Sequence, residues 1–157
     1  MKEGNTLKKV KANLEICKHI AEGKIVHGQA VGKNLTFIFT IPGYYGYFFT
    51  KEDIAFAFEK IEMISKDKKS FVDLSIIKPE NEIKSTKEIQ LFDNEKESSR
   101  KFVAKDGREV WINNKYLCNL VVQECCFYQD NKNPAGIIIA VEKGVPVMGL
   151  LPVRHYN

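Results

Sequence analysis

The side chains with the greatest chemical reactivity are four cysteines, at positions 17, 118, 125 and 126, and three histidines, at 19, 27 and 155. No Cys-x-x-Cys pair occurs, and no two histidines stand at the spacing of metal ligands. These residue types leave open a cysteine nucleophile activated by a histidine, but no motif surrounds any of the histidines. The pattern favours buried, reduced thiols and predicts neither a metal nor a cofactor.

Carboxylate pairs, nucleophile motifs and phosphate-binding loops are likewise missing from the sequence. The segment Gly43-Tyr44-Tyr45-Gly46 contains glycines, but not at the spacing that cradles a phosphate. The aromatic residues within 44–49 allow stacking on nucleic-acid bases or packing in a strand, and the pattern favours the strand. We therefore expect a protein without enzymatic activity, and an enzyme of unknown class is an alternative.

Lysine is concentrated near the N-terminus. Residues 1–33 contain seven lysines and three glutamates, so this segment carries the whole net charge of +4. Apolar residues recur every three or four positions from Thr6 to Glu22, which predicts a helix with an inward face of Leu7, Val10, Leu14, Cys17 and Ala21. Lysines on its other faces either contact phosphates or are simply solvated, and the DNA-binding candidates are Lys8, Lys9, Lys11 and Lys18.

The composition is that of a globular protein, with 44% hydrophobic and 28% charged residues. No apolar run approaches the roughly 20 residues needed to span a bilayer. The first residues, Met1-Lys2-Glu3-Gly4-Asn5, lack the apolar core of a signal peptide. We expect a cytoplasmic protein without a membrane partner, built from one domain and part of another.

The rest of the chain alternates between helical and strand patterns. Strands are expected at 24–31 and 35–41, a second helix at 51–65, and a third at 114–124, with Thr50 and Asn113 as caps. Further strands are expected at 71–77, 83–92, 101–104 and 108–112, with Lys105-Asp106-Gly107 as a hairpin turn, and closing strands at 125–129, 136–141 and 145–153. From residue 44 onwards a helix-plus-three-strand unit is repeated, which predicts an α+β fold with sheets packed on helices.

With this order of elements, several short motifs resemble the bacterial sliding clamp, the β subunit of the replicative DNA polymerase. Asn113-Asn114-Lys115-Tyr116-Leu117 and Phe49-Thr50-Lys51-Glu52-Asp53-Ile54 are similar to helix starts in the last domain of that family. Asn133-Pro134 before an apolar strand, and Leu151-Pro152-Val153-Arg154, are similar to its closing segments. The resemblance implies a DNA-clamp-like fold, with residues 44–157 as a clamp-like domain and 1–43 as a partial unit.

In that family the last strand borders a hydrophobic cleft where polymerases and repair proteins dock through short peptide motifs. The resemblance implies a processivity or docking factor in DNA replication that forms a homo-oligomer and associates with double-stranded DNA. It assigns the partner-peptide cleft to Met148, Leu150, Leu151, Pro152, Val153 and Arg154. Independently, Pro152 cannot donate a ladder hydrogen bond, which places this strand at an edge, where an apolar strand can dock a peptide. A C-terminal core strand is the alternative interpretation.

A second function fits the same residues: a stand-alone protein-interaction module, of phage or mobile-element origin, that mimics a clamp domain without binding DNA. A clamp-like factor would self-associate and bind DNA with an affinity that falls steeply with salt. The interaction module would be a monomer or a dimer without DNA affinity.

Overall fold

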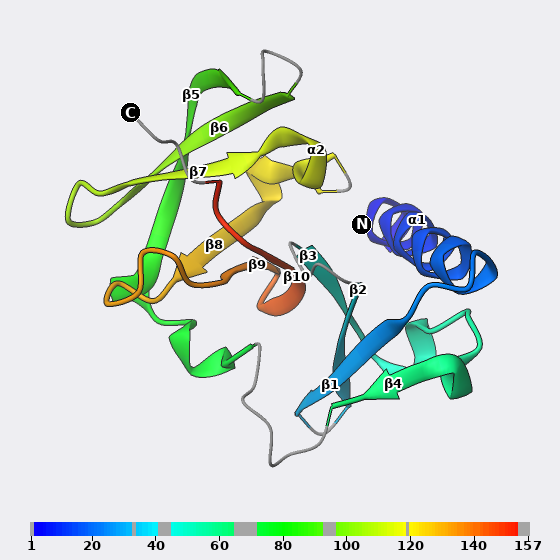
Figure 1. Cartoon of the computed structure of the whole chain (residues 1–157). Helices are drawn as coiled ribbons and strands as arrows, with labels where there is room; N and C mark the ends of the chain where they lie inside the picture. Colours follow the sequence, from blue (N-terminus) through cyan, green and yellow to red (C-terminus); the bar gives the residue numbers. More distant parts are fainter. Residues whose placement is uncertain are drawn as a thin grey trace. The chain divides into compact units, whose positions relative to one another are not determined.

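The computed structural model of the chain describes residues 2–32, 34–40, 45–64, 72–92, 97–118 and 120–153, with side chains described from residue 9 onwards except Phe92. The chain divides into two compact units, Met1–Asp73 (unit 1) and Leu74–Asn157 (unit 2). Among the described residues there are ten strands and two α-helices, one of which has only four residues (Figure 1). The structure is therefore dominated by strands, and the predicted clamp-like fold of repeated helix-plus-three-strand units is wrong.

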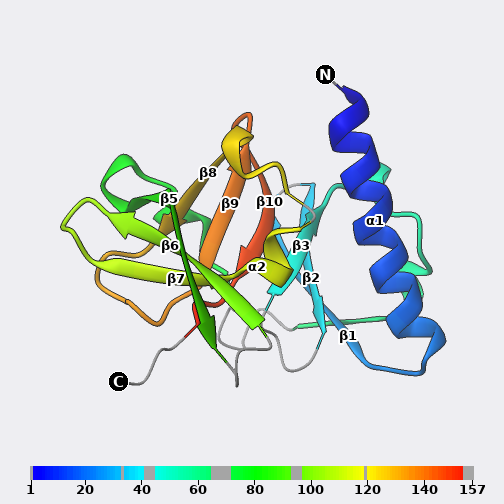
Figure 2. The same cartoon turned by 90° about the horizontal axis from the view of Figure 1, so that it is seen from above.

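Unit 1 contains a four-stranded sheet and one long helix. Its strands are β1 (Val26–Gly32), β2 (Leu35–Thr40), β3 (Tyr45–Phe49) and β4 (Ile61–Met63), in the order β4-β1-β2-β3. β1, β2 and β3 pair antiparallel, whereas β4 runs parallel to β1. The helix α1 (Lys2–Ala21) lies beside this sheet (Figure 1, Figure 2). The predicted first helix and the two strands after it are present within a few residues of their expected bounds.

The sheet of unit 1 carries large side chains on both faces because successive residues of a strand point to opposite sides. Phe37 stacks on Phe39 and packs against Phe48 on one face, with ring centroids 5.5 Å and 4.9 Å away. Gly46 lies opposite Phe39 in the β2–β3 ladder. A Cβ at Gly46 would stand 2.6 Å from the main-chain oxygen of Ile38, so the close approach of β3 to β2 requires glycine there.

The second predicted helix, at 51–65, is wrong. The chain there forms two 3-10 turns, η1 (Lys51–Asp53) and η2 (Phe58–Lys60), and then strand β4. The Asn13 side chain donates to the main-chain oxygen of Asp53 at 2.8 Å and accepts from the main-chain nitrogen of Ala55 at 2.7 Å. A partner distant in sequence therefore takes the backbone groups that a helix would have paired internally.

Unit 2 is built from six strands. They are β5 (Glu82–Phe92), β6 (Glu97–Ala104), β7 (Glu109–Asn113), β8 (Cys125–Gln129), β9 (Ile138–Glu142) and β10 (Val145–Leu150), in the order β10-β9-β8-β5-β6-β7. Every neighbouring pair in this order is antiparallel. The main-chain nitrogen of Val153 donates to the oxygen of Trp111 on β7 at 2.8 Å. The segment after β10 thus returns to β7, at the opposite end of the strand order, so the sheet curls on itself.

The third predicted helix, at 114–124, is mostly wrong. Helix α2 covers only Asn114–Leu117, and the 3-10 turn η5 (Val122–Glu124) leads into β8. The predicted cap is confirmed, because the Asn113 side chain accepts from the main-chain nitrogen of Lys115 at 2.9 Å. The β-branched pair Val121–Val122 disfavours further helical turns.

Three other predictions concern a hairpin, a strand and the domain boundary. The Lys105-Asp106-Gly107 hairpin is confirmed between β6 and β7, with Gly107 at a φ of 86°. The strand predicted at 71–77 is wrong for the described residues 72–77, where the 3-10 turn η3 (Leu74–Ile76) forms, and a second turn, η4 (Pro79–Asn81), follows it. Phe71 lies outside the described residues. The domain boundary predicted between residues 43 and 44 falls between β2 and β3, which are paired neighbours in unit 1.

Candidate functional site

The C-terminal residues assigned to a peptide cleft lie mostly in or beside the core of unit 2. Met148 and Leu150 are fully buried, so neither is available to a docking peptide in this structure. Leu151, Pro152 and Val153 are half-buried. The main-chain nitrogen of Val153 is already paired with Trp111, so it is not a donor for an added strand. Arg154, the last residue of the predicted cleft, lies outside the described residues.

The lysines assigned to DNA binding differ in their surroundings. Lys9 forms an ion pair with Asp53, with Nζ and Oδ2 2.9 Å apart, so this lysine helps to hold α1 to its own unit. Burial raises the pKa of the Asp53 carboxyl, but hydrogen bonds from Lys9 and Thr50 outweigh it and lower that pKa below its usual value. Lys11 and Lys18 are exposed, and in the described part of the chain neither forms an ion pair. The side chain of Lys8 is outside the described set.

The inward face of α1 consists of Ala12, Asn13 and Ile16, which are all less than a tenth exposed. Asn13 makes the paired hydrogen bonds with the 53–55 segment, and Ile16 lies against β2 and β3. A buried amide that satisfies both its donor and its acceptor fixes a helix in one orientation, because any rotation leaves polar groups unpaired.

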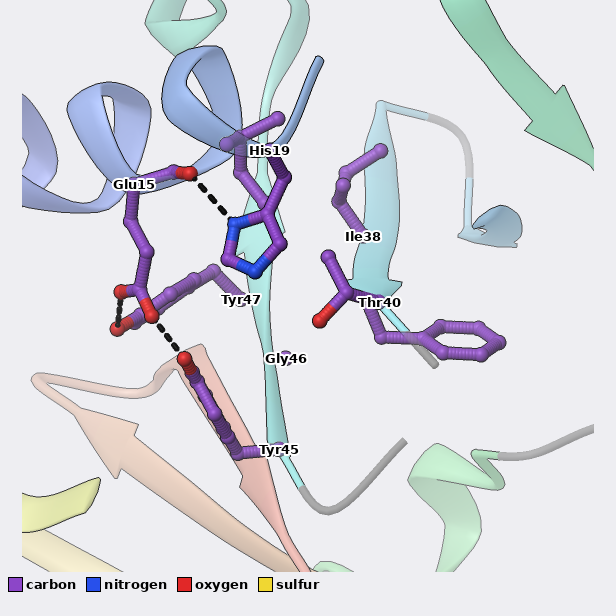
Figure 3. Close-up of a pocket in the computed structure, with 9 residues that line it drawn as sticks. Glu15, His19, Ile38, Thr40, Tyr45, Gly46 and Tyr47 are labelled. Atoms are coloured by element: carbon purple, nitrogen blue, oxygen red, sulfur yellow. Dashed lines mark hydrogen bonds between the residues drawn. The ribbon is translucent and has the colours of Figure 1, made fainter. Parts of the chain in front are cut away.

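Glu15, two residues after Asn13, holds α1 in the same orientation. Its carboxylate accepts hydrogen bonds from the hydroxyls of Tyr45 and Tyr47, which both project from β3, and the Tyr47 oxygen is 2.6 Å away (Figure 3). Hydrogen bonds to a charged acceptor are stronger than those between neutral groups. Because both carboxylate oxygens are occupied by phenol hydroxyls, we interpret Glu15 as an anchor for α1 and not as a catalytic base.

A small concavity lies beside this anchor. It has a volume of about 180 Å³, which includes open solvent, and it is bordered by Glu15, His19, Thr40, Tyr45 and Gly46 among others (Figure 3). The room inside it for a water-sized sphere is only about 10 Å³, roughly what one water molecule needs, whereas sites for drug-sized ligands usually enclose about 300–1,000 Å³. The Nδ1 atom of His19 lies 2.8 Å from the main-chain oxygen of Glu15, and because that oxygen can only accept, Nδ1 carries the proton.

The opposite side of α1 is apolar and exposed. Val10 is 48% exposed and Leu14 is 63% exposed, Cys17 is half-buried, and Ala21 is exposed. These residues, with Lys11 and Lys18 beside them, are called the outer face of α1 below. The sequence pattern predicted that this stripe points inward together with Leu7, whose side chain lies outside the described set. The structure shows the reverse for Val10, Leu14 and Ala21, which are exposed. The signal that identifies the true inward face is Asn13 together with Glu15, whose partners cannot be located from sequence alone.

Metal-binding side chains do not gather into a site in the part of the chain that the structure describes. No group of three or more histidine, cysteine, aspartate or glutamate side chains is placed to hold a metal ion there. No disulfide joins the four cysteines, and Cys118 and Cys126 are exposed, which differs from the predicted burial. These described residues therefore give no geometric support to the enzyme alternatives of the sequence analysis.

Comparisons with known proteins add no identity. No family model, no curated protein and no solved structure matches this chain. Within the described residues, no helix has both the length and the apolar character needed to cross a membrane. A functional hypothesis must therefore rest on the surface chemistry of the chain itself.

Proposed function

We propose that this chain is a protein-interaction module that docks a helix of another protein on the outer face of α1. The observation that carries the proposal is the exposure of Val10 and Leu14 on a helix that is firmly anchored by its other side. Single exposed apolar residues are common on protein surfaces, but these belong to a regular stripe.

The spacing of that stripe is compatible with helix pairing. Val10, Leu14, Cys17 and Ala21 follow alternating steps of four, three and four residues, as do the a and d positions of a heptad repeat. A stripe this narrow is the pattern of a coiled-coil seam, whereas a helix facing a core usually carries a wider one. Fully burying a leucine or valine side chain contributes about 1.5–3 kcal/mol, so covering the exposed part of Val10 (48%) and of Leu14 (63%) contributes roughly half of that for each residue.

This proposal keeps the interaction module from the sequence analysis and changes where it binds. Docking of replication or repair proteins, association with double-stranded DNA, homo-oligomer formation and a cytoplasmic location stay predictions that the fold and the comparisons do not address. The C-terminal segment Leu151–Val153 is the alternative docking place, supported by its half-buried apolar side chains.

The test uses a synthetic helical peptide with leucine at its a and d positions and glutamine at its flanking positions. Fluorescence anisotropy should show saturable binding of the labelled peptide to the full chain. Leu14→Glu should weaken that binding at least tenfold, because it places a charge in the seam. Leu91→Glu is the matched control, since Leu91 is 55% exposed on β5, in the other unit, and its variant should bind normally. No binding by the wild-type chain, or equal losses in both variants, would refute the proposal.

A further inference from the structure

The outer face of α1 has charge on only one flank. Lys11 follows Val10 and Lys18 follows Cys17, so both lysines lie one residue further round the helix on the same side, seven residues apart. They occupy the e positions of the heptad, which in coiled coils determine the choice of partner. The other flank holds Asn13 and Ile20, which are buried and half-buried against unit 1.

Among the acidic side chains that the structure describes on α1 and just after it, neither Glu15 nor Glu22 forms an ion pair with Lys11 or Lys18. Both oxygens of Glu15 accept hydrogen bonds from Tyr45 and Tyr47. The Glu22 carboxylate pairs with Lys24, at a distance of 3.0 Å, and the charge of Lys18 acts on it more weakly. Lys11 and Lys18 therefore give the docking surface a positive rim beside an apolar seam.

From this arrangement we infer that the partner is an acidic amphipathic helix, with apolar residues at its own a and d positions and glutamate or aspartate along the flank that meets Lys11 and Lys18. The inference rests on the proposed docking function and adds the chemistry of the partner. Opposite charges across such a seam favour the correct partner and its register, and like charges exclude wrong ones.

A second copy of this chain fits the surface less well. Antiparallel pairing of two α1 helices would set the lysines of one copy against those of the other, which is unfavourable. Parallel pairing would set them against Asn13 and Ile20 of the other copy, which carry no charge and are covered by their own unit. Neither arrangement supplies a carboxylate to the lysine flank.

Nucleic acid also fits less well, because it uses only part of the surface. Phosphates would neutralise Lys11 and Lys18, but the exposed side chains of Val10 and Leu14 would gain nothing from a phosphate backbone. An acidic helix engages the lysines and the apolar stripe together.

The test compares three synthetic helices with the same leucine seam and with glutamate, glutamine or lysine at the flanking positions. The full chain should bind the glutamate helix about three- to tenfold more tightly than the glutamine helix, and the lysine helix most weakly. The preference should shrink as salt is raised from about 0.05 M to about 0.5 M, because the Debye length falls roughly threefold over this range and the charges are screened. The double variant Lys11→Glu/Lys18→Glu should reverse the ranking, and circular dichroism should show that it is folded, because both side chains are exposed.

The possible outcomes separate the two levels of the proposal. Equal affinity for all three helices would refute the acidic partner but leave helix docking in place. Failure of every helix to bind would refute docking as well. Two further results would overturn the inference. The first is a doubled mass in light scattering without peptide, which returns to the monomer mass in Leu14→Glu. The second is binding of a double-stranded oligonucleotide that is lost in the lysine double variant, when no helix binds.

Discussion

Truncating Ile16 and Leu14 to alanine distinguishes the two faces of α1. Ile16 is only 2% exposed, and Ile16→Ala removes three carbons from the contact with β2 and β3. At about 0.8 kcal/mol for each carbon, plus the cost of the cavity, the free energy of unfolding should fall by roughly 2–4 kcal/mol. Leu14 is 63% exposed, so Leu14→Ala should change that free energy by no more than about 0.5 kcal/mol.

Urea denaturation followed by far-ultraviolet circular dichroism measures both variants on the same scale. Fluorescence of Trp111, which lies on β7 of unit 2, reports whether the loss remains within unit 1. If Leu14→Ala lowers the unfolding free energy as much as Ile16→Ala, or if Ile16→Ala has no effect, then α1 presents the opposite face. The seam would then be buried, and the reasoning behind the proposed function would be refuted.

Two further predictions concern the packing and the charges of unit 1. Gly46→Ala should lower the free energy of unfolding by about 1–3 kcal/mol because its Cβ would meet the backbone of β2. Gly32 has open space around it, so Gly32→Ala should leave the free energy of unfolding unchanged. Equal urea midpoints for the two variants would contradict this packing. Because the pKa of Asp53 is lowered in the folded protein, its ionised form stabilises the fold above the unfolded-state pKa of about 3.9, and this contribution disappears as pH falls through the folded-state pKa. Asp53→Asn should thus be less stable than the wild type at neutral pH and converge with it in acid, and a difference that does not shrink would argue against the Lys9–Asp53 pair.

Local patterns in the sequence were sufficient to place most of the strands. Strand β8 has the predicted bounds of 125–129, and β1, β2, β5 and β10 begin within two residues of the predicted starts. These segments combine apolar or β-branched residues with clear turn signals, such as Gly144 before β10, so their structure is decided by near neighbours.

The helices were harder to predict because distant contacts decide them. The 51–65 segment has helical spacing, but Asn13 takes up backbone groups of Asp53 and Ala55, about 40 residues away in the chain. The rotation of α1 is likewise set by polar anchors, with Glu15 held by two tyrosines on β3. Hydrophobic periodicity assumes that the apolar stripe is the buried one, and α1 violates that assumption.

The candidate site was only partly visible in the sequence. Lys11, Lys18 and the apolar stripe were recognised as features of the first helix, but they were assigned to separate roles, in DNA binding and in the core. The C-terminal motif Leu151-Pro152-Val153-Arg154 suggested a free edge, whereas Val153 is paired with Trp111 and Leu150 is buried. Whether a strand edge is free depends on the topology of the whole sheet, which short motifs do not encode.

The most direct measurement of the docking surface is a nuclear magnetic resonance titration of the isotope-labelled full chain with the acidic helix. Amide and methyl signals of Val10, Leu14 and Lys18 should shift progressively and saturate, while those of unit 2 stay in place. Shifts confined to unit 2, above all around Leu151 and Val153, would show that partners dock at the C-terminal segment and not on α1.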